Sequence, residues 1–301
     1  MSNDNSPINL DGLTVPIVTP LTKNRKIDKA GIEKLVNFQL DNGVDKIFVA
    51  GTTGEFASLP RNERREGLRL VLEATNNRVP VYYGVSHSSS AVAVKEAKAT
   101  EGLGIDAFVS TPPFYYDYSQ EEIFRHFKAI TEAVDLPVII YDIPSKTQNM
   151  VELSTLKNLS QEENVVGLKD TTGDMNRFQI LVKEFEGRSD FSIAQGTEEY
   201  FYHSLLSGAE GLVSGMANLW PSKIREQIDM VEAGNYEEAR KIQFELFDVF
   251  RVYDQASFLA GIKTGLSLKG ICSAHLSEPF RPPTEEEEKN IERILLESGI
   301  L

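Results

Sequence analysis

Short apolar segments alternate along this chain with segments of helical periodicity. Eight of the apolar segments are bounded by turn residues and predict strands that are buried on both faces. They are Leu13–Pro20, Lys46–Gly51, Val79–Val85, Ala107–Pro112, Pro137–Pro144, Val165–Asp170, Phe191–Gly196 and Gly211–Asn218. Their first residues lie 20 to 33 residues apart, which leaves room for one helix in each interval.

The intervening segments carry helix signals. Ile32, Leu35 and Val36 fall at i, i+3 and i+4, on one face of a helix. Ser119 is followed three residues later by Glu122, the spacing of a capping box. The further predicted helices are Arg61–Ala74, Ser119–Ala133, Met175–Phe185, Glu198–Leu206 and Ser222–Ala233.

Strands that alternate with helices indicate a parallel sheet, and eight such units predict a closed (β/α)₈ TIM barrel. The alternative is an open, doubly wound sheet, which would normally carry a glycine-rich turn after its first strand. Residues 19–22 contain no glycine, so we favour the barrel. After Gly234 the pattern is helical throughout. We therefore predict a catalytic barrel over residues 1–234 and a C-terminal helical extension, packed on the barrel, over residues 235–301.

Composition excludes several classes of function. The 301 residues carry a net charge of −14, which disfavours a nucleic-acid-binding surface. Cys272 is the single cysteine and the four histidines are scattered, so we expect no disulfide, no metal site and no cofactor. Residues 1–10 are polar without a signal pattern, and no apolar run is long enough to span a bilayer. We expect a soluble cytoplasmic protein that does not bind membranes.

Lys169 lies at the carboxyl end of the predicted strand Val165–Asp170. An amine held in apolar surroundings loses hydration, which favours its neutral, nucleophilic form, and a neutral amine forms a Schiff base with a ketone. The alternative is a structural lysine that extends to solvent and pairs with Asp170.

Three other strand ends carry candidate chemistry. Gly51–Glu55 places Thr52 and Thr53 between two glycines, a turn suited to binding a carboxylate through backbone N–H groups. Thr111–Tyr116 joins two prolines to aromatic residues, and Tyr141–Lys146 begins with a phenol that suits proton transfer near a Schiff base. The alternatives are a plain strand-to-helix turn, packing at the barrel rim and a core tyrosine. Together the strand ends suit a ketoacid substrate.

The segments GTTGE, TPPFYY, YDIPS, GLKDTTGD and GLVSGMAN, at residues 51–55, 111–116, 141–145, 167–174 and 211–218, occur in family-like order and spacing. The chain thereby resembles the dihydrodipicolinate synthase / N-acetylneuraminate lyase family over nearly its whole length. These are class I, pyruvate-dependent aldolases on a (β/α)₈ barrel. The resemblance implies pyruvate and an aldehyde as substrates, no cofactor, and a homotetramer or homodimer.

The resemblance also assigns roles to residues. It implies that Lys169 forms the imine with pyruvate and that Tyr141 transfers protons. Thr52, Thr53 and Gly54 would hold the pyruvate carboxylate, with the Thr53 hydroxyl in a proton relay. Tyr115 matches a second relay tyrosine, which in many members reaches in from a neighbouring subunit. Gly196 and the Val213 carbonyl match positions that contact the substrate.

Lys146 departs from the pattern of the synthases, which usually place an arginine there to grip the carboxylate of aspartate semialdehyde. A lysine keeps the charge and loses the bidentate fork. Phe56 follows Glu55, and the resulting segment GTTGEF resembles that of the aldolases of 2-keto-3-deoxy sugar acids. We therefore favour such an aldolase, with dihydrodipicolinate synthase as the alternative. A non-catalytic ketoacid-binding barrel is a remote third hypothesis, because binding alone needs no nucleophilic lysine.

Overall fold

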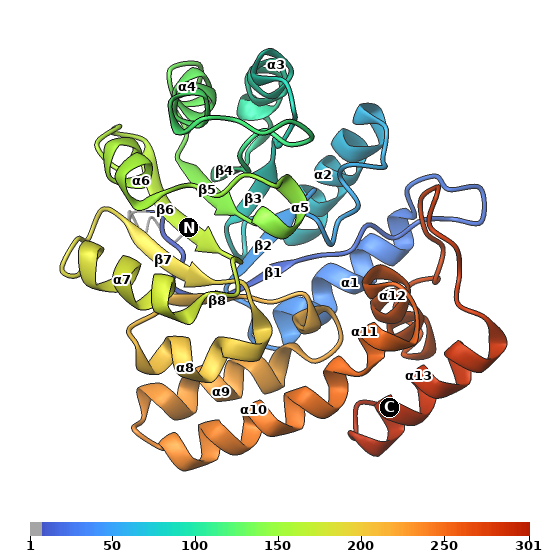
Figure 1. Cartoon of the computed structure of the whole chain (residues 1–301). Coiled ribbons are helices and arrows are strands. Elements are labelled where there is room, and N and C mark those ends of the chain that lie inside the picture. Colours follow the sequence, from blue (N-terminus) through green and yellow to red (C-terminus); the bar gives the residue numbers. More distant parts are fainter. Residues whose placement is uncertain (1–7) are drawn as a thin grey trace. The chain divides into compact units, whose positions relative to one another are not determined.

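The computed structural model describes residues 8–301, so the first seven residues of the polar N-terminal stretch lie outside the described residues. All eight predicted strands form, and they pair in chain order as a closed parallel barrel with helices in the intervals (Figure 1). This confirms the predicted (β/α)₈ fold class.

The strands are short and almost entirely buried. They are β1 (Gly12–Pro16), β2 (Lys46–Val49), β3 (Val81–Gly84), β4 (Ala107–Ser110), β5 (Val138–Asp142), β6 (Val165–Asp170), β7 (Ser192–Gln195) and β8 (Gly211–Val213). Most end earlier than predicted, because burial continues past the last ladder residue. Val18, after β1, is 1% exposed, yet its N–H donates to the Asn218 side chain rather than to a neighbouring strand.

Every predicted helix is present, and the predicted capping box at Ser119 forms. The Ser119/Glu122 capping box opens one helix, and Thr284 with Glu287 opens another. The helices are α1 (Lys29–Asp41), α2 (Arg61–Thr75), α3 (Ser90–Thr100), α4 (Gln120–Thr131), α5 (Pro144–Thr147), α6 (Leu153–Leu159), α7 (Met175–Phe185), α8 (Phe201–Leu206), α9 (Pro221–Glu232), α10 (Tyr236–Phe250), α11 (Val252–Gln255), α12 (Phe258–Leu268) and α13 (Glu285–Glu297). The sequence analysis missed α3, α5 and α6. In α3 the buried face consists of Ala93, Glu96, Ala97 and Thr100, which give no apolar periodicity.

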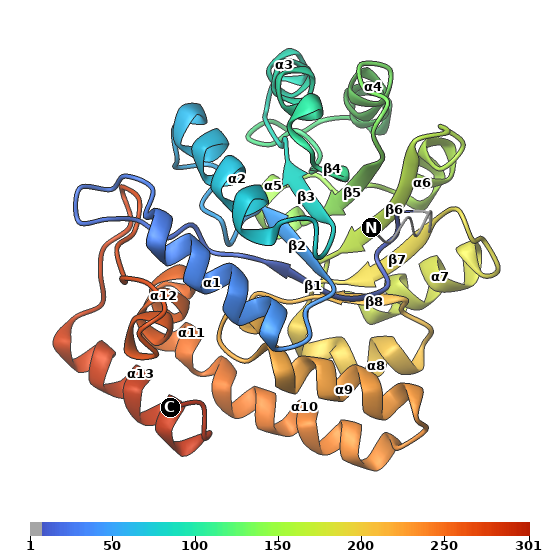
Figure 2. The ribbon, with the colours of Figure 1, turned by 180° about the vertical axis from the view of Figure 1, so that it is seen from behind.

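The contacts divide the chain into two compact units. Unit 1 comprises residues 8–11 and 82–212 and contains β4 to β7, all of β3 but its first residue, and the first two residues of β8. Figure 2 shows α3, α4, α6 and α7 on the outside of these strands. Its core lies between strands and helices, where Ile140 and Leu168 pack with Phe127 and Phe178, all fully buried.

Unit 2 comprises residues 12–81 and 213–301 and contains β1, β2 and the last residue of β8, Val213, together with α9 to α13. Within it α10 packs against α9, and α11 and α12 pack against α13. The C-terminal helices thus belong to the same compact unit as β1 and β2. A domain boundary at residue 234 stays a prediction. Within residues 8–301 no helix combines the length and the apolar character that crossing a bilayer requires.

Candidate active site

Lys169 and Tyr141 lie side by side at the carboxyl ends of paired strands. They are direct partners in the parallel ladder of β5 and β6. The Lys169 Nζ lies 3.9 Å from the centroid of the Tyr141 ring. Lys169 is 6% exposed and Tyr141 4% exposed, so the lysine does not extend to solvent as the structural alternative required. The arrangement presents a buried primary amine against the face of a phenol.

Gly196, just after β7, leaves room for the lysine. A Cβ at this position would lie 2.6 Å from the Lys169 Cε and 2.2 Å from the Thr171 Oγ1. Any side chain here would displace the Lys169 stem. Gly196 also donates its N–H to the Asp170 carbonyl at 2.7 Å. The structure therefore places Gly196 against the predicted nucleophile, and its contact with substrate stays a prediction.

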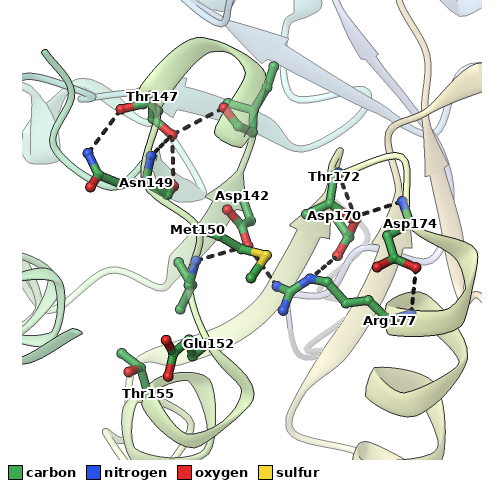
Figure 3. A network of polar contacts seen from close by, with 12 residues as sticks. Asp142, Thr147, Asn149, Met150, Glu152, Thr155, Asp170, Thr172, Asp174 and Arg177 are labelled. Atoms are coloured by element: carbon green, nitrogen blue, oxygen red, sulfur yellow. Dashed lines mark hydrogen bonds and ion pairs between the residues drawn. The ribbon is translucent and has the colours of Figure 1, made fainter. Parts of the chain in front are cut away.

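Behind this pair lies an ion-pair network that the sequence analysis missed (Figure 3). Asp142 follows Tyr141, Asp170 follows Lys169, and both carboxylates contact Arg177 on α7. The Arg177 Nη2 lies 2.7 Å from the Asp142 Oδ2, and its Nε lies 3.2 Å from the Asp170 Oδ2. The aspartate side chains are 0% and 1% exposed and the arginine side chain 11%.

Burial raises the pKa of Asp142 to about 7, the Arg177 guanidinium opposes that rise, and the Asp170 carboxylate adds to it. The sequence did contain a signal for this network. Two acids on neighbouring buried strands, each directly after a candidate catalytic residue, require a cation nearby. Arg177 lies seven residues after Asp170, in the first turn of α7, and is the cation that this signal could have identified.

Tyr115 and Lys146 lie on two exposed segments that are joined by Asn149. Tyr115 is 75% exposed and has a φ of 89°, an unusual backbone conformation for an aromatic residue. Lys146 is exposed, in α5. The buried Asn149 Nδ2 donates to the carbonyls of Pro113, at 3.0 Å, and Tyr116, at 2.8 Å. Asn149, which the sequence analysis did not single out, thus fixes both sides of the Tyr115 loop.

Unit 2 carries the predicted carboxylate turn after β2. Thr53 is 4% exposed, and the turn is closed by Glu55 N–H donating to the Thr52 carbonyl at 3.1 Å. Gly54 is buried, and a Cβ there would lie 3.1 Å from the Ala50 nitrogen. The close approach of the backbone therefore favours a glycine at this position. The left-handed residues of the turn are Ala50 and Glu55.

The same unit brings the end of β8 to this turn. A Cβ built on Gly215, two residues after the buried Val213, would lie 3.7 Å from the Thr53 Oγ1. The Thr53 hydroxyl therefore lies beside the segment that follows β8.

Glu55 anchors the turn to the C-terminal helices. Its carboxylate forms an ion pair with Lys263 of α12, and both side chains are 0% exposed. The other carboxylate oxygen, Oε2, accepts the Ser277 N–H and hydroxyl, each at 2.7 Å. This anchor was also missed, because its members are more than 200 residues apart in sequence.

Several of the predicted site residues lie close together within each unit. Lys169, Tyr141 and Gly196 come together in unit 1, and Thr53 lies beside the β8 end in unit 2. Among the residues that the structure describes, no three His, Cys, Asp or Glu side chains are arranged to hold a metal ion. The expectation that the reaction needs no metal and no cofactor stays a prediction.

Known proteins resemble the chain over its whole length. A 4-hydroxy-tetrahydrodipicolinate synthase from Thermotoga neapolitana is 32% identical over 292 residues, which cover 96% of this chain and 99% of the relative. A chloride-inhibited dihydrodipicolinate synthase from Acinetobacter baumannii, solved in complex with pyruvate, superposes with a TM-score of 0.92 at 29% identity, covering 97% and 100% of the two chains. A dihydrodipicolinate synthase described as a first monomeric variant also gives 0.92 at 29% identity, covering 97% and 98%.

The sequence profile of the dihydrodipicolinate synthetase family matches residues 9–298. With this match and these relatives, the chain is an enzyme, a lyase of the class I aldolase type, and it belongs to the dihydrodipicolinate synthetase family.

Proposed function

We propose that Lys169 attacks the ketone of pyruvate and forms an imine with it, releasing water. Loss of a proton from the pyruvate methyl group then gives an enamine, which forms a carbon–carbon bond with an aldehyde, or is formed when such a bond is cleaved. The observation that carries this proposal is the buried Lys169 Nζ, 3.9 Å from the centroid of the Tyr141 ring.

The other predicted residues complete the proposal. Tyr141 carries protons to and from the imine, because its ring lies directly against the nucleophile. Thr52, Thr53 and Gly54 bind the pyruvate carboxylate through the turn after β2, and the Thr53 hydroxyl extends the relay. Val213 contributes its carbonyl to the substrate. A non-catalytic ketoacid-binding barrel would not need a buried primary amine against a phenol, so we set that hypothesis below the enzyme.

For the acceptor we propose aspartate semialdehyde, the substrate of the synthases. The curated relatives are named 4-hydroxy-tetrahydrodipicolinate synthase, and they support this alternative better than the sugar-acid aldolase that the sequence favoured. Lys146 is exposed in α5, after the strand end that carries Tyr141, where its ammonium would bind the acceptor carboxylate as a point charge. A 2-keto-3-deoxy sugar acid is the second candidate, favoured by the absence of an arginine fork at this position.

Reductive trapping tests the imine. Pyruvate with borohydride should add a stable mass to the peptide that contains Lys169. Lys46 provides a control within the same sample, because it is similarly buried, 7% exposed, but begins β2 rather than ending a strand. Labelling of Lys46, or labelling that persists in Lys169→Ala, would refute the assignment of Lys169.

An acceptor screen tests the second step. With pyruvate present, aspartate semialdehyde should be condensed faster than glyceraldehyde, the product of sugar-acid cleavage. Lys146→Arg should raise kcat/KM for aspartate semialdehyde, and Lys146→Ala should lower it. Efficient cleavage of 2-keto-3-deoxygluconate, with aspartate semialdehyde unused, would establish the second candidate instead.

We also propose a homo-oligomer that acts in the cytoplasm. Tyr115 is 75% exposed in a single chain, which suits a residue that completes the site of a neighbouring subunit. One solved relative is described as monomeric, so the family does not fix the subunit count. Sedimentation velocity should find a dimer or tetramer. Mixed oligomers of Tyr115→Phe and Lys169→Ala chains should recover activity that neither homo-oligomer has.

A further inference from the structure

Two aspartates pair across β5 and β6 in the same register as Tyr141 and Lys169. Asp142 and Asp170 are partners in the β5–β6 ladder, directly after the partners Tyr141 and Lys169. Successive side chains of a strand point to opposite faces. The aspartates therefore face the helix layer, on the side where Ile140 packs, and the tyrosine and lysine face the other way.

Arg177 is the cation that joins the two strand ends on the helix side. Its guanidinium contacts Asp142 at 2.7 Å and Asp170 at 3.2 Å through different nitrogens, so one planar group spans both strands (Figure 3). Without it, two buried carboxylates would face each other with no compensating charge.

The remaining bonds leave little freedom in this arrangement. The Asp170 Oδ1 accepts the Thr172 N–H at 2.9 Å and its hydroxyl at 2.7 Å. The Asp142 Oδ2 also accepts the Val151 N–H at 3.1 Å. Among residues 8–301 the Asp142 Oδ1 has no hydrogen-bond partner, so Asp142 depends on Arg177 more than Asp170 does.

Arg177 is itself fixed to the turn that follows Lys169. Its backbone N–H donates to Asp174, the N-cap of α7, at 3.0 Å. The Asp174 N–H donates in turn to the Thr172 hydroxyl at 3.3 Å. The guanidinium is therefore tied to the end of β6 through the backbone and reaches across to β5 with its side chain.

We infer that Arg177 is a positioning residue of the active site: by joining Asp142 to Asp170 it holds the ends of β5 and β6 in register and so keeps the Tyr141 ring against the Lys169 amine. This inference rests on the proposed imine chemistry. Displacing a catalytic group by about 1 Å can cost roughly 10²-fold in rate. Loss of the bridge should therefore slow imine formation without removing any group that touches the substrate.

The test compares variants of Arg177 with a matched arginine. Arg177→Met removes the charge and keeps a stem of similar length, whereas Arg177→Lys keeps the charge without the fork. Arg188→Met is the control, because Arg188 also forms an ion pair in unit 1, with Asp190 at 2.7 Å, after the far end of α7. The rate of pyruvate imine formation is measured by rapid quench with borohydride, and steady-state kcat and KM are measured alongside.

We expect Arg177→Met to slow imine formation and to lower kcat by about 10²-fold, with KM for pyruvate changed less than about threefold. Arg177→Lys should recover part of the loss, and Arg188→Met should resemble wild type. If Arg177→Met does not fold, Asp142→Leu/Arg177→Met replaces the Asp142–Arg177 pair with apolar side chains, leaves Asp170 with the Thr172 donors, and still lacks the bridge.

The outcomes separate the two proposals. A folded Arg177→Met or double variant that forms the imine at the wild-type rate overturns the positioning role, even if its melting temperature falls. Loss of rate in Arg188→Met equal to that in Arg177→Met overturns it as well. Absence of any pyruvate adduct in the wild-type enzyme overturns the proposed function, and this inference with it.

Discussion

Replacing Lys263 by methionine should destabilise the enzyme severely, because it leaves a buried carboxylate without its cation. The Lys263 Nζ forms an ion pair with Glu55 and donates to the His275 carbonyl at 2.7 Å. Both charged side chains are 0% exposed. Among residues 8–301, the donors that remain to the Glu55 carboxylate in Lys263→Met are the N–H and hydroxyl of Ser277.

The magnitude follows from this burial. Removing one partner of a buried ion pair costs about 3–5 kcal/mol. Unfolding entropy near 60 °C is about 2.1 cal/mol/K per residue. For 301 residues this makes about 0.6 kcal/mol/K, so the melting temperature should fall by roughly 5–8 °C if unfolding is a single transition. An exposed pair gives the contrast. Arg293 and Glu297 on α13 are 51% and 54% exposed, and Arg293→Met should cost about 0.3–0.5 kcal/mol, under about 1 °C.

Differential scanning calorimetry and urea unfolding measure both variants. The double variant Glu55→Gln/Lys263→Met, which has no buried charge, should lose less stability than Lys263→Met alone. A Lys263→Met shift no larger than that of Arg293→Met would refute the reasoning. It would show that the pair contributes no more than an ion pair at the surface.

Three further predictions concern the site. Tyr141→Phe keeps the ring and removes the proton carrier, so kcat should fall by roughly 10²-fold or more while pyruvate trapping at Lys169 is weakened less; near-normal turnover would mean that the proton takes another route. The folded pKa of Asp142, about 7, lies above its ordinary value of 3.8, so its contribution to stability is full below about pH 4 and is lost as the pH rises through 7. Asp142→Asn should remove this dependence, and parallel urea-unfolding profiles for variant and wild type between pH 4 and 7 would contradict it. Lys146→Ala should cost more than tenfold in kcat/KM with aspartate semialdehyde and less than tenfold with a sugar acid, measured on the same enzyme preparation.

Local sequence signals predicted most of the fold because they act over a few residues. Apolar runs marked every strand, and β6 has the predicted bounds, because Val165–Asp170 is bounded by turn residues on both sides. The Ser119/Glu122 capping box placed the start of α4 within one residue. The helix α3 was missed because alanines bury its face without producing an apolar stripe. Strand ends were overestimated, because burial does not distinguish a ladder residue from a buried loop residue such as Val18.

The sequence points to candidate site residues where a residue's own chemistry marks it. A lysine and a tyrosine at strand ends indicate a candidate nucleophile and a candidate proton carrier, and the structure places these two side chains against each other. Residues that act by holding others carry no such mark. Glu55 and Lys263 are common charged residues, and their pairing depends on packing between a turn and a helix more than 200 positions later.

The alternation of a strand explains why Asp142 was not singled out from the sequence. Read along the chain, Asp142 is simply the residue after Tyr141 in the YDIPS segment. In the folded strand the two side chains point to opposite faces, so the role proposed for Tyr141 says nothing about Asp142. What the pair Asp142 and Asp170 does imply is a charge balance: two buried acids side by side need a cation from the layer that they face. That layer is α7, and its first turn supplies Arg177. A substitution of Asp142 by asparagine is then compatible with the same bridge, because an amide oxygen still accepts from the guanidinium, whereas a substitution by an apolar residue requires that Arg177 change as well.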